Sequence, residues 1–289
     1  MTTSVRRKLE GKVKPRRKGL TAWLSHHTFR RLVQLGVFGF IVFIAIRHFL
    51  VGEEGATVTA SWEAYCPMGG LETLYKYIAA GGSFVAHVHL SNVVLLAAAL
   101  ALALVARNAF CGWVCPFGFI QDMISSFSKF IQKKVKPIRQ AVKALKTRGA
   151  GLAVLDRYLR LLKYGVLIWA VAGAAVYGFM VFRDADPWAA LWNLFLEGSL
   201  GFGTLVLGVV LAAALFVERP WCRYACPLGA ATGLVGKLSP FYLKRNAAAC
   251  TSCAICTRAC PVGLPIHTAT TIKHADCMTC LECVGECPR

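Results

Sequence analysis

Apolar residues are gathered into four long runs along the chain. The runs cover Leu32–Leu50, His89–Val105, Leu161–Phe182 and Leu200–Val217, with almost no charged residue inside them. Each has about 17–22 residues, the length that a helix needs to cross the hydrocarbon core of a bilayer. Four such runs in a chain of 289 residues, of which 56% are hydrophobic, predict four transmembrane helices. We expect the first run to remain in the protein, because no small-residue cleavage site of a signal peptide follows it.

Charged residues alternate in sign between the segments that flank these runs. Residues 1–31 carry ten Lys and Arg, and the segment between the second and third runs is also basic, with KKVK at 133–136. The other two connecting segments are acidic, through Glu53, Glu54, Glu63, Glu72, Asp184, Asp186 and Glu197. Because Lys and Arg collect on the cytoplasmic side, this pattern predicts a multi-pass protein of the cytoplasmic (inner) membrane with both termini in the cytoplasm. The net charge of +19 then reflects topology and contact with anionic membrane lipid, and we expect no nucleic acid as a partner.

Eight of the thirteen cysteines lie in the last forty residues, in two copies of one motif. Each copy reads Cys-x2-Cys-x2-Cys-x3-Cys-Pro, the spacing of bacterial two-cluster ferredoxins. The compact part of the motif supplies three thiolates to a [4Fe–4S] cluster, and the distant Cys-Pro supplies the fourth ligand of the other cluster. We therefore predict two [4Fe–4S] clusters. Their ligands are Cys250, Cys253, Cys256 and Cys287 for one cluster, and Cys277, Cys280, Cys283 and Cys260 for the other.

Four further cysteines form two matching pairs at the ends of the second and fourth runs. The sequences RNAFCGWVCPFGFI and ERPWCRYACPLGAA share an arginine, then Cys-x3-Cys-Pro, an apolar residue and glycine. This similarity predicts a duplicated two-helix unit in parallel orientation. The proline disfavours helix at Cys115 and Cys226 but suits the first turn of a new helix. We therefore expect the membrane helix to break there and an amphipathic interfacial helix to begin.

Three interpretations of these pairs remain open. Their cysteines pack as ordinary buried residues, form a redox-active dithiol or transient metal site, or converge to hold a third metal centre. The third interpretation involves Cys111, Cys115, Cys222 and Cys226 together. The second cysteine of each pair is expected at a helix N-terminus, where the helix dipole favours the thiolate. The remaining cysteine, Cys66 in YCPMGGLETLY, is a weaker candidate for a redox role or a partner contact.

Two other features carry less weight. EGATVT at 54–59 is similar to the flavin-attachment signature of respiratory flavoproteins, but it is only a few residues long. We expect a polar turn there rather than covalent FMN on Thr57. His48, His87 and His89 lie near the outer ends of the first two runs. We expect them to bind no cofactor, ahead of a role at a quinone site or as haem ligands.

The complete pattern resembles the NapH-type membrane ferredoxins, and equally the membrane half of NosR-like proteins, from Arg30 to Cys287. The paired CGWVCP and CRYACP motifs carry this resemblance more specifically than the ferredoxin motifs do. It implies an all-α membrane protein with four transmembrane helices and a small C-terminal two-cluster ferredoxin-like domain. We expect a basic tail at 1–31, a transmembrane domain at 32–245 and the ferredoxin-like domain at 246–289.

The same resemblance implies a function in electron transfer. Members of the family are quinol dehydrogenase components, with quinone or quinol as substrate and a ferredoxin, flavoprotein or cytochrome as redox partner. An alternative hypothesis is a factor that reduces copper, or matures a metal site, for a respiratory oxidase or reductase. A third is a membrane anchor whose clusters only hold the C-terminal segment together.

Overall fold

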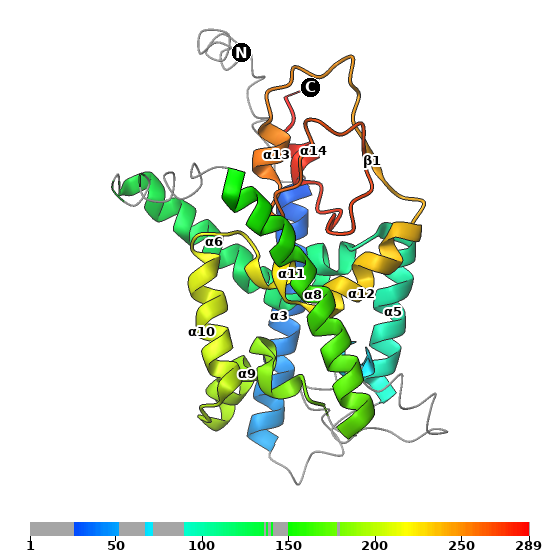
Figure 1. Ribbon diagram of the computed structural model, residues 1–289. Coiled ribbons are helices and arrows are strands. Elements are labelled where there is room, and N and C mark those ends of the chain that lie inside the picture. Colours follow the sequence, from blue (N-terminus) through cyan, green and yellow to red (C-terminus); the bar gives the residue numbers. More distant parts are fainter. Residues whose placement is uncertain are drawn as a thin grey trace.

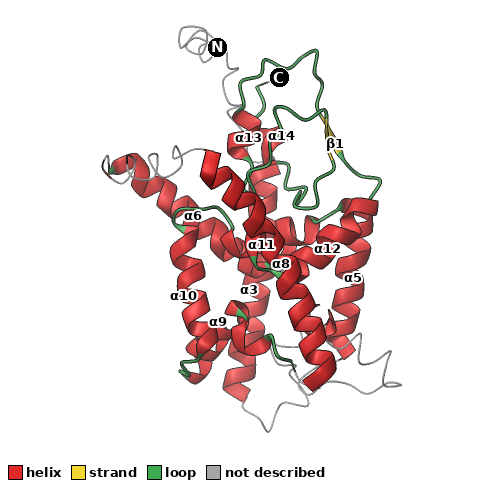
Figure 2. Ribbon diagram, in the orientation of Figure 1, coloured by secondary structure: helices red, strands yellow, loops and turns green. Residues whose placement is uncertain are grey.

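The computed structural model describes residues 26–51, 67–71, 90–135, 137, 140, 150–177 and 180–288, and this part of the chain is mostly helical (Figures 1 and 2). Thr57, Cys66, His87, His89 and the side chain of His48 lie outside what the structure describes. The hypotheses about these five residues therefore remain predictions.

Each of the four apolar runs contains a helix. The helices are α3 (His26–Val51), α5 (Leu90–Ala106), α8 (Ala150–Tyr177) and α10 (Phe202–Ala214). Among the described residues, two stretches are long and apolar enough to cross a membrane, His27–Arg47 in α3 and Val154–Tyr177 in α8. Helices α5 and α10 are apolar but shorter.

The helix of the third run differs from the run Leu161–Phe182 at both ends. Helix α8 begins at Ala150 and ends at Tyr177, so the expected continuation to Phe182 is wrong. The ring of Phe182 is buried instead, with centroid distances of 6.3 Å to Trp169 and 6.1 Å to Trp221. The chain beyond α8 therefore folds back against the helices, because its aromatic residues find partners there.

The predicted breaks at the two cysteine pairs are confirmed. Cys115 (φ −60°, ψ 115°) and Cys226 (φ −69°, ψ 113°) have extended backbones, and the proline that follows each begins a new helix. These helices are α6 (Pro116–Lys134) and α12 (Pro227–Val235).

The apolar helices themselves end earlier than expected, before either pair. Helix α5 stops at Ala106 because Arg107 is left-handed (φ 61°), a conformation that cannot continue a right-handed helix. The first cysteine of each pair then lies in a short segment of its own, the π-helix η3 (Phe110–Val114) or α11 (Pro220–Tyr224).

Helix α6 has the amphipathic character that its sequence predicts. Ser125 and Ser128 donate hydrogen bonds to the carbonyls of Ala214 (3.1 Å) and Leu215 (2.6 Å) at the end of α10. These bonds satisfy carbonyl groups that a helix C-terminus leaves free. The exposed side of α6 is apolar, through Met123, Phe127 and Phe130.

The C-terminal segment lies at one end of the helices (Figure 1). It contains η6 (Gly236–Leu238), β1 (Leu243–Lys244), α13 (Ile255–Ala259), β2 (Thr271–Ile272) and α14 (Glu282–Gly285). The strands pair antiparallel, with Leu243 opposite Ile272. Val262, Leu264 and Met278 pack with Ile272 in a small core, which is separate from the core of the helical region.

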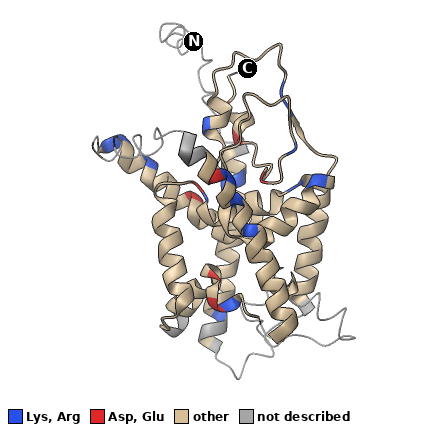
Figure 3. Ribbon diagram, viewed as in Figure 1, with Lys and Arg blue, Asp and Glu red and all other residues tan. Residues whose placement is uncertain are grey.

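Buried charges join this segment to α8. Asp276 is ion-paired with Arg160 (2.8 Å) and Lys163, and Arg160 also donates to the carbonyl of Val262 (2.6 Å). Figure 3 shows Lys and Arg gathered where the helices meet the C-terminal segment. Burial alone would raise the pKa of Asp276, but Lys163 and Arg160 outweigh it, and the pKa lies below its ordinary value.

Asp276→Asn should therefore strongly destabilise the docked segment. Loss of one partner from a buried ion pair costs about 3–5 kcal/mol, because the other charge is left uncompensated. Since the pKa of Asp276 is lowered by folding, its contribution is present above the unfolded value of about 3.9 and is lost as pH falls through the folded value. Denaturant unfolding in detergent at several pH values measures both effects.

Glu218→Gln is the matched control. Its partner Lys129 is 56% exposed, so this pair should contribute less than about 1 kcal/mol. Equal losses for the two variants would contradict the role assigned to Asp276.

Candidate functional site

Both ferredoxin motifs wind in the same unusual way. In each, the second cysteine lies between two residues with positive φ: Ser252 (53°) and Ala254 (57°) in the first, Thr279 (48°) and Leu281 (59°) in the second. Non-glycine residues rarely adopt this strained conformation, and such residues concentrate at functional sites. Here it lets the amides of Ser252 and Thr279 hydrogen-bond to the sulfurs of Cys250 and Cys277. Both loops are therefore shaped to hold anionic sulfur ligands.

One group of cysteines opens to the surface. A cavity of about 370 Å³ is lined by the three closely spaced cysteines of the first motif and by residues of the second. Its cysteines are Cys250, Cys253, Cys256, Cys283 and Cys287. The cavity thus contains the complete ligand set that the spacing predicts for one cluster. We call Cys250, Cys253, Cys256 and Cys287 the distal group. Because Cys287 is exposed, this group lies within reach of another protein.

The other group in the C-terminal segment is more deeply enclosed. Burial, together with the neighbouring Cys280, Cys260 and Cys277, raises the pKa of Cys283 to about 12. Burial likewise raises the pKa of those three cysteines. Neighbouring cysteines of this set contribute to the raised pKa values, so the four thiols lie close together. We call Cys260, Cys277, Cys280 and Cys283 the proximal group.

The two Cys-x3-Cys-Pro pairs meet in one cavity of about 90 Å³. Its lining includes all four cysteines, Cys111, Cys115, Cys222 and Cys226. Asp186 also lines it, together with Phe117, Trp188 and Trp221. Asp186 was expected on the far side of the membrane from the cysteines, but the fold-back after α8 brings it to the same cavity. We call the four cysteines the inner group.

Burial dominates the electrostatics of the inner group. Cys115 and Cys226 cap α6 and α12 as predicted, and the amide of Gly229 donates to the Cys226 sulfur (3.3 Å). Burial nevertheless raises the pKa of Cys222 to about 12, and it raises the pKa of the other three cysteines. The amides at the two helix N-termini favour the thiolates of Cys115 and Cys226, as expected, but burial has the larger effect on their pKa. Desolvation and mutual repulsion outweigh the amides, and a bound metal would supply the missing positive charge.

The segments that carry the inner and proximal groups are in direct contact. Gly112 lies so close to Met278 that a Cβ atom on it would come within 2.6 Å of the Met278 carbonyl oxygen. Trp113 donates to the carbonyl of Thr279 (3.1 Å), and Thr279 donates to the carbonyl of Ala106 (2.9 Å). The loop that carries Cys277 and Cys280 thus rests on the segment that carries Cys111 and Cys115.

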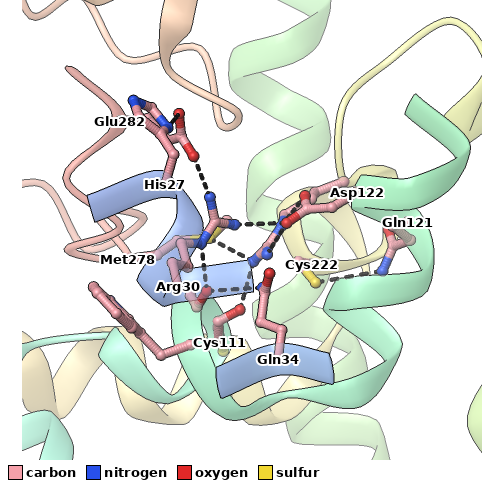
Figure 4. Close-up of polar contacts among 12 residues, drawn as sticks. His27, Arg30, Gln34, Cys111, Gln121, Asp122, Cys222, Met278 and Glu282 are labelled. Atoms are coloured by element: carbon pink, nitrogen blue, oxygen red, sulfur yellow. Dashed lines mark hydrogen bonds and ion pairs between the residues drawn. The ribbon is translucent and has the colours of Figure 1, made fainter. Parts of the chain in front are cut away.

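Buried charges surround this contact (Figure 4). Arg219 donates to both carboxylate oxygens of Asp122 (2.7 and 2.6 Å), to the carbonyl of Cys111 and to the Met278 sulfur (2.9 Å). Arg30 pairs with the same Asp122 (2.6 Å) and with Glu282 (2.6 Å). These contacts connect α3, α6 and both cysteine motifs.

No role was predicted for Asp122 or for the buried arginines, and Asp186 was predicted only as a charged residue of an acidic connecting segment. The shared arginine before each cysteine pair was the available signal, but it is equally consistent with a basic membrane boundary. Among the described residues, no three His, Cys, Asp or Glu side chains lie close enough to hold a single metal ion. In a [4Fe–4S] cluster held by four cysteines each cysteine binds a different iron atom, so its ligands do not converge on one point.

Known proteins match this architecture. A family model described as "4Fe-4S binding domain" matches residues 88–136 and again 200–246, one match for each cysteine pair. A model described as "4Fe-4S dicluster domain" matches residues 242–288. No solved structure matches the chain significantly.

Several curated proteins are similar to the chain in sequence. The chain is 29% identical over 280 residues to the "Putative electron transport protein YccM" of Escherichia coli K12, covering 92% of this chain and 74% of the relative. It is 30% identical over 194 residues to "Ferredoxin-type protein NapH" of Haemophilus influenzae, covering 64% and 61%. These similarities support a NapH-like ferredoxin-type protein. The chain is also 30% identical over 191 residues to "Regulatory protein NosR" of Stutzerimonas stutzeri, covering 64% and 24%. The matched models and relatives together support an iron–sulfur electron transport protein family.

Gly112→Ala should loosen the contact between the inner and proximal groups. The added methyl meets backbone, which cannot rotate away, so we expect a loss of about 1–3 kcal/mol. Faster proteolysis of the C-terminal segment in detergent measures this loss. Gly208→Ala in α10 is the control, because its Cβ meets no atom within 4 Å. An unchanged proteolysis rate for Gly112→Ala would contradict the close contact.

Proposed function

We propose that this protein is an integral membrane electron-transfer protein that moves electrons between the quinol pool and a redox partner protein. The observation that carries this proposal is the contact of Gly112 with Met278. Through it the segment that carries the inner group touches the segment that carries the proximal group, and the proximal Cys283 lines the cavity of the distal group. The three cysteine groups thus form one continuous series from the helices to an exposed surface.

Four membrane-spanning helices, arranged as a duplicated two-helix unit, belong to this proposal. Large apolar side chains point outward on all four helices, as a lipid-facing surface requires. Examples are Phe43 and Ile46 of α3, Val94 and Val105 of α5, Ile168 and Val176 of α8, and Leu205 and Val209 of α10. The two matches to one family model support the duplication. The alternation of charge supports cytoplasmic termini, with domains at 1–31, 32–245 and 246–289.

We assign a [4Fe–4S] cluster to the distal group and another to the proximal group. The left-handed loops, the amides directed at sulfur and the thiolate-rich donor sets fit such clusters. We assign a third iron–sulfur centre to the inner group, whose four thiols share one buried cavity. When bound, an iron–sulfur cluster takes up and releases single electrons.

The protein's own residues give these centres different surroundings. Helix N-termini at Cys115 and Cys226 hold the inner group among aromatic side chains, away from water. Exposed Cys287 leaves the distal group open to a partner. Oxidation of one quinol to quinone releases two electrons and two protons, and we infer that it takes place at the end of the series inside the helices.

Iron content tests the third centre. Purified protein should hold about twelve iron atoms per chain if all three centres are [4Fe–4S], and about ten if the inner one is [2Fe–2S]. The Cys111/Cys115/Cys222/Cys226→Ser variant should retain about eight. About eight in the unmodified protein would contradict the third centre.

The same measurement tests the alternative function of copper reduction or metal maturation. Buried thiolates also suit Cu(I), which is the observation that favours this alternative. Copper bound in the unmodified protein and lost in the fourfold variant, with iron constant at about eight, would support the alternative and contradict the iron–sulfur assignment.

Quinol oxidation has its own test. Oxidised protein in detergent, mixed with a menaquinol analogue, should develop the EPR signals of reduced clusters. The fourfold Cys→Ser variant should develop these signals at least about tenfold more slowly, because it lacks the inner centre that first accepts electrons from quinol. Intact clusters that no quinol reduces, but that dithionite does reduce, would contradict quinol as the electron donor.

A further inference from the structure

Two arginines occupy equivalent places in the two copies of the repeat. Arg107 precedes the pair at Cys111, and Arg219 precedes the pair at Cys222. Both are left-handed (φ 61° and 52°), and both are buried, at 2% and 0% exposure. Left-handed backbone is uncommon for arginine, so its occurrence at both positions indicates a shared structural purpose.

Both side chains reach the same loop of the C-terminal segment. Arg107 donates to the carbonyl of His274 (3.0 Å), which also accepts a hydrogen bond from the backbone amide of Cys277 (3.0 Å). Arg219 donates to the sulfur of Met278 (2.9 Å), which lies between Cys277 and Cys280 in the chain. The loop at 274–280 is therefore held between two cations, one from each copy of the repeat.

The two arginines differ in how their charges are compensated. Arg219 makes two hydrogen bonds to the carboxylate of Asp122. Arg107 has no carboxylate partner among the described ion pairs, and its buried Nε and Nη1 atoms have no hydrogen-bond partner in the described part of the chain. Buried donors without acceptors are costly and rare in folded proteins. An anionic acceptor beside Cys277 would satisfy them, and the sulfur of a cluster has that chemistry.

We propose that Arg107 and Arg219 are positioning residues that clamp the loop at 274–280 and raise the reduction potential of the cluster in the proximal group. The proposal rests on the proposed function, which places a cluster at Cys260, Cys277, Cys280 and Cys283. Reduction adds a negative charge, and burial disfavours it. A nearby cation in a medium of low dielectric constant stabilises the reduced form and offsets that effect. Arg107 should have the larger influence, because no carboxylate neutralises it.

The experiment is a redox titration of the full-length protein in detergent, followed by EPR. The signal that disappears in Cys280→Ser identifies the proximal cluster. Arg107→Gln keeps a hydrogen-bond donor but removes the charge, and it should make reduction about tenfold less favourable. This corresponds to a midpoint potential about 59 mV more negative for a one-electron couple. Arg107→Lys should restore most of the potential, and Arg219→Gln should shift it less than Arg107→Gln does.

Arg258→Gln is the matched control. It removes one positive charge from an exposed residue of α13, where solvent screens it, and should leave the proximal potential unchanged. An unchanged potential in Arg107→Gln at normal iron content, or an equal shift in Arg258→Gln, would overturn the proposal.

A second measurement does not depend on any variant folding. In protein labelled with ¹⁵N-arginine, pulsed EPR of the reduced proximal cluster should detect ¹⁵N couplings, and their absence would overturn the proposal. Failure of the cluster assignment, on which the proposed function depends, would look different. In that case the unmodified protein would bind no iron and give no cluster signal at all.

Discussion

Arg219 carries a positive charge where solvent does not reach, and much of the arrangement around it compensates that charge. Asp122 accepts two hydrogen bonds from it, and Arg30 shares the same carboxylate. A buried cation is costly unless its charge is compensated by partners. Asp122 lies in α6, Arg30 in α3 and Met278 in the ferredoxin-type segment, so completing this set of contacts requires all three to be in place. The network therefore specifies the position of the segment, in addition to whatever stability it contributes.

That position places the cysteine groups in a series. The close approach of Gly112 to Met278 and the hydrogen bond from Trp113 to Thr279 join the segments that carry the inner and proximal groups. Cys283 belongs to the proximal group and also lines the distal cavity. Hydrogen bonds to the helices are made by Val262 and by residues between His274 and Glu282. The second ferredoxin motif thus faces the helices, while the exposed Cys287 and the cavity beside it remain accessible.

The sequence predicted those features that depend on local chemistry. Apolar runs predicted the helices, and proline after Cys115 and Cys226 predicted the breaks in the backbone. Features that depend on distant partners could not be predicted. Asp276 pairs with Arg160, which precedes the third apolar run, and with Lys163 inside that run, although more than a hundred residues separate them in the sequence. Asp186 was placed with a charged loop, and only the packing of Phe182 on Trp221 brings it to the inner cavity. The ligand sets remain predictions, which the cavities support.

The inner group shows how two opposing local effects are resolved by the whole fold. A helix N-terminus stabilises a thiolate by a modest amount, because the dipole acts only over the first turn. Complete burial next to three other thiols acts in the opposite direction and is stronger, so the pKa of Cys222 is raised to about 12. Without metal, the four cysteines are therefore neutral thiols, which repel one another little. With metal, the amides at the two helix N-termini are already directed at sulfur. Metal binding then depends on proton release. Assembly of the inner centre should therefore depend on pH more strongly than metal binding by Cys250, a partly exposed cysteine whose pKa is lowered by the amide of Ser252.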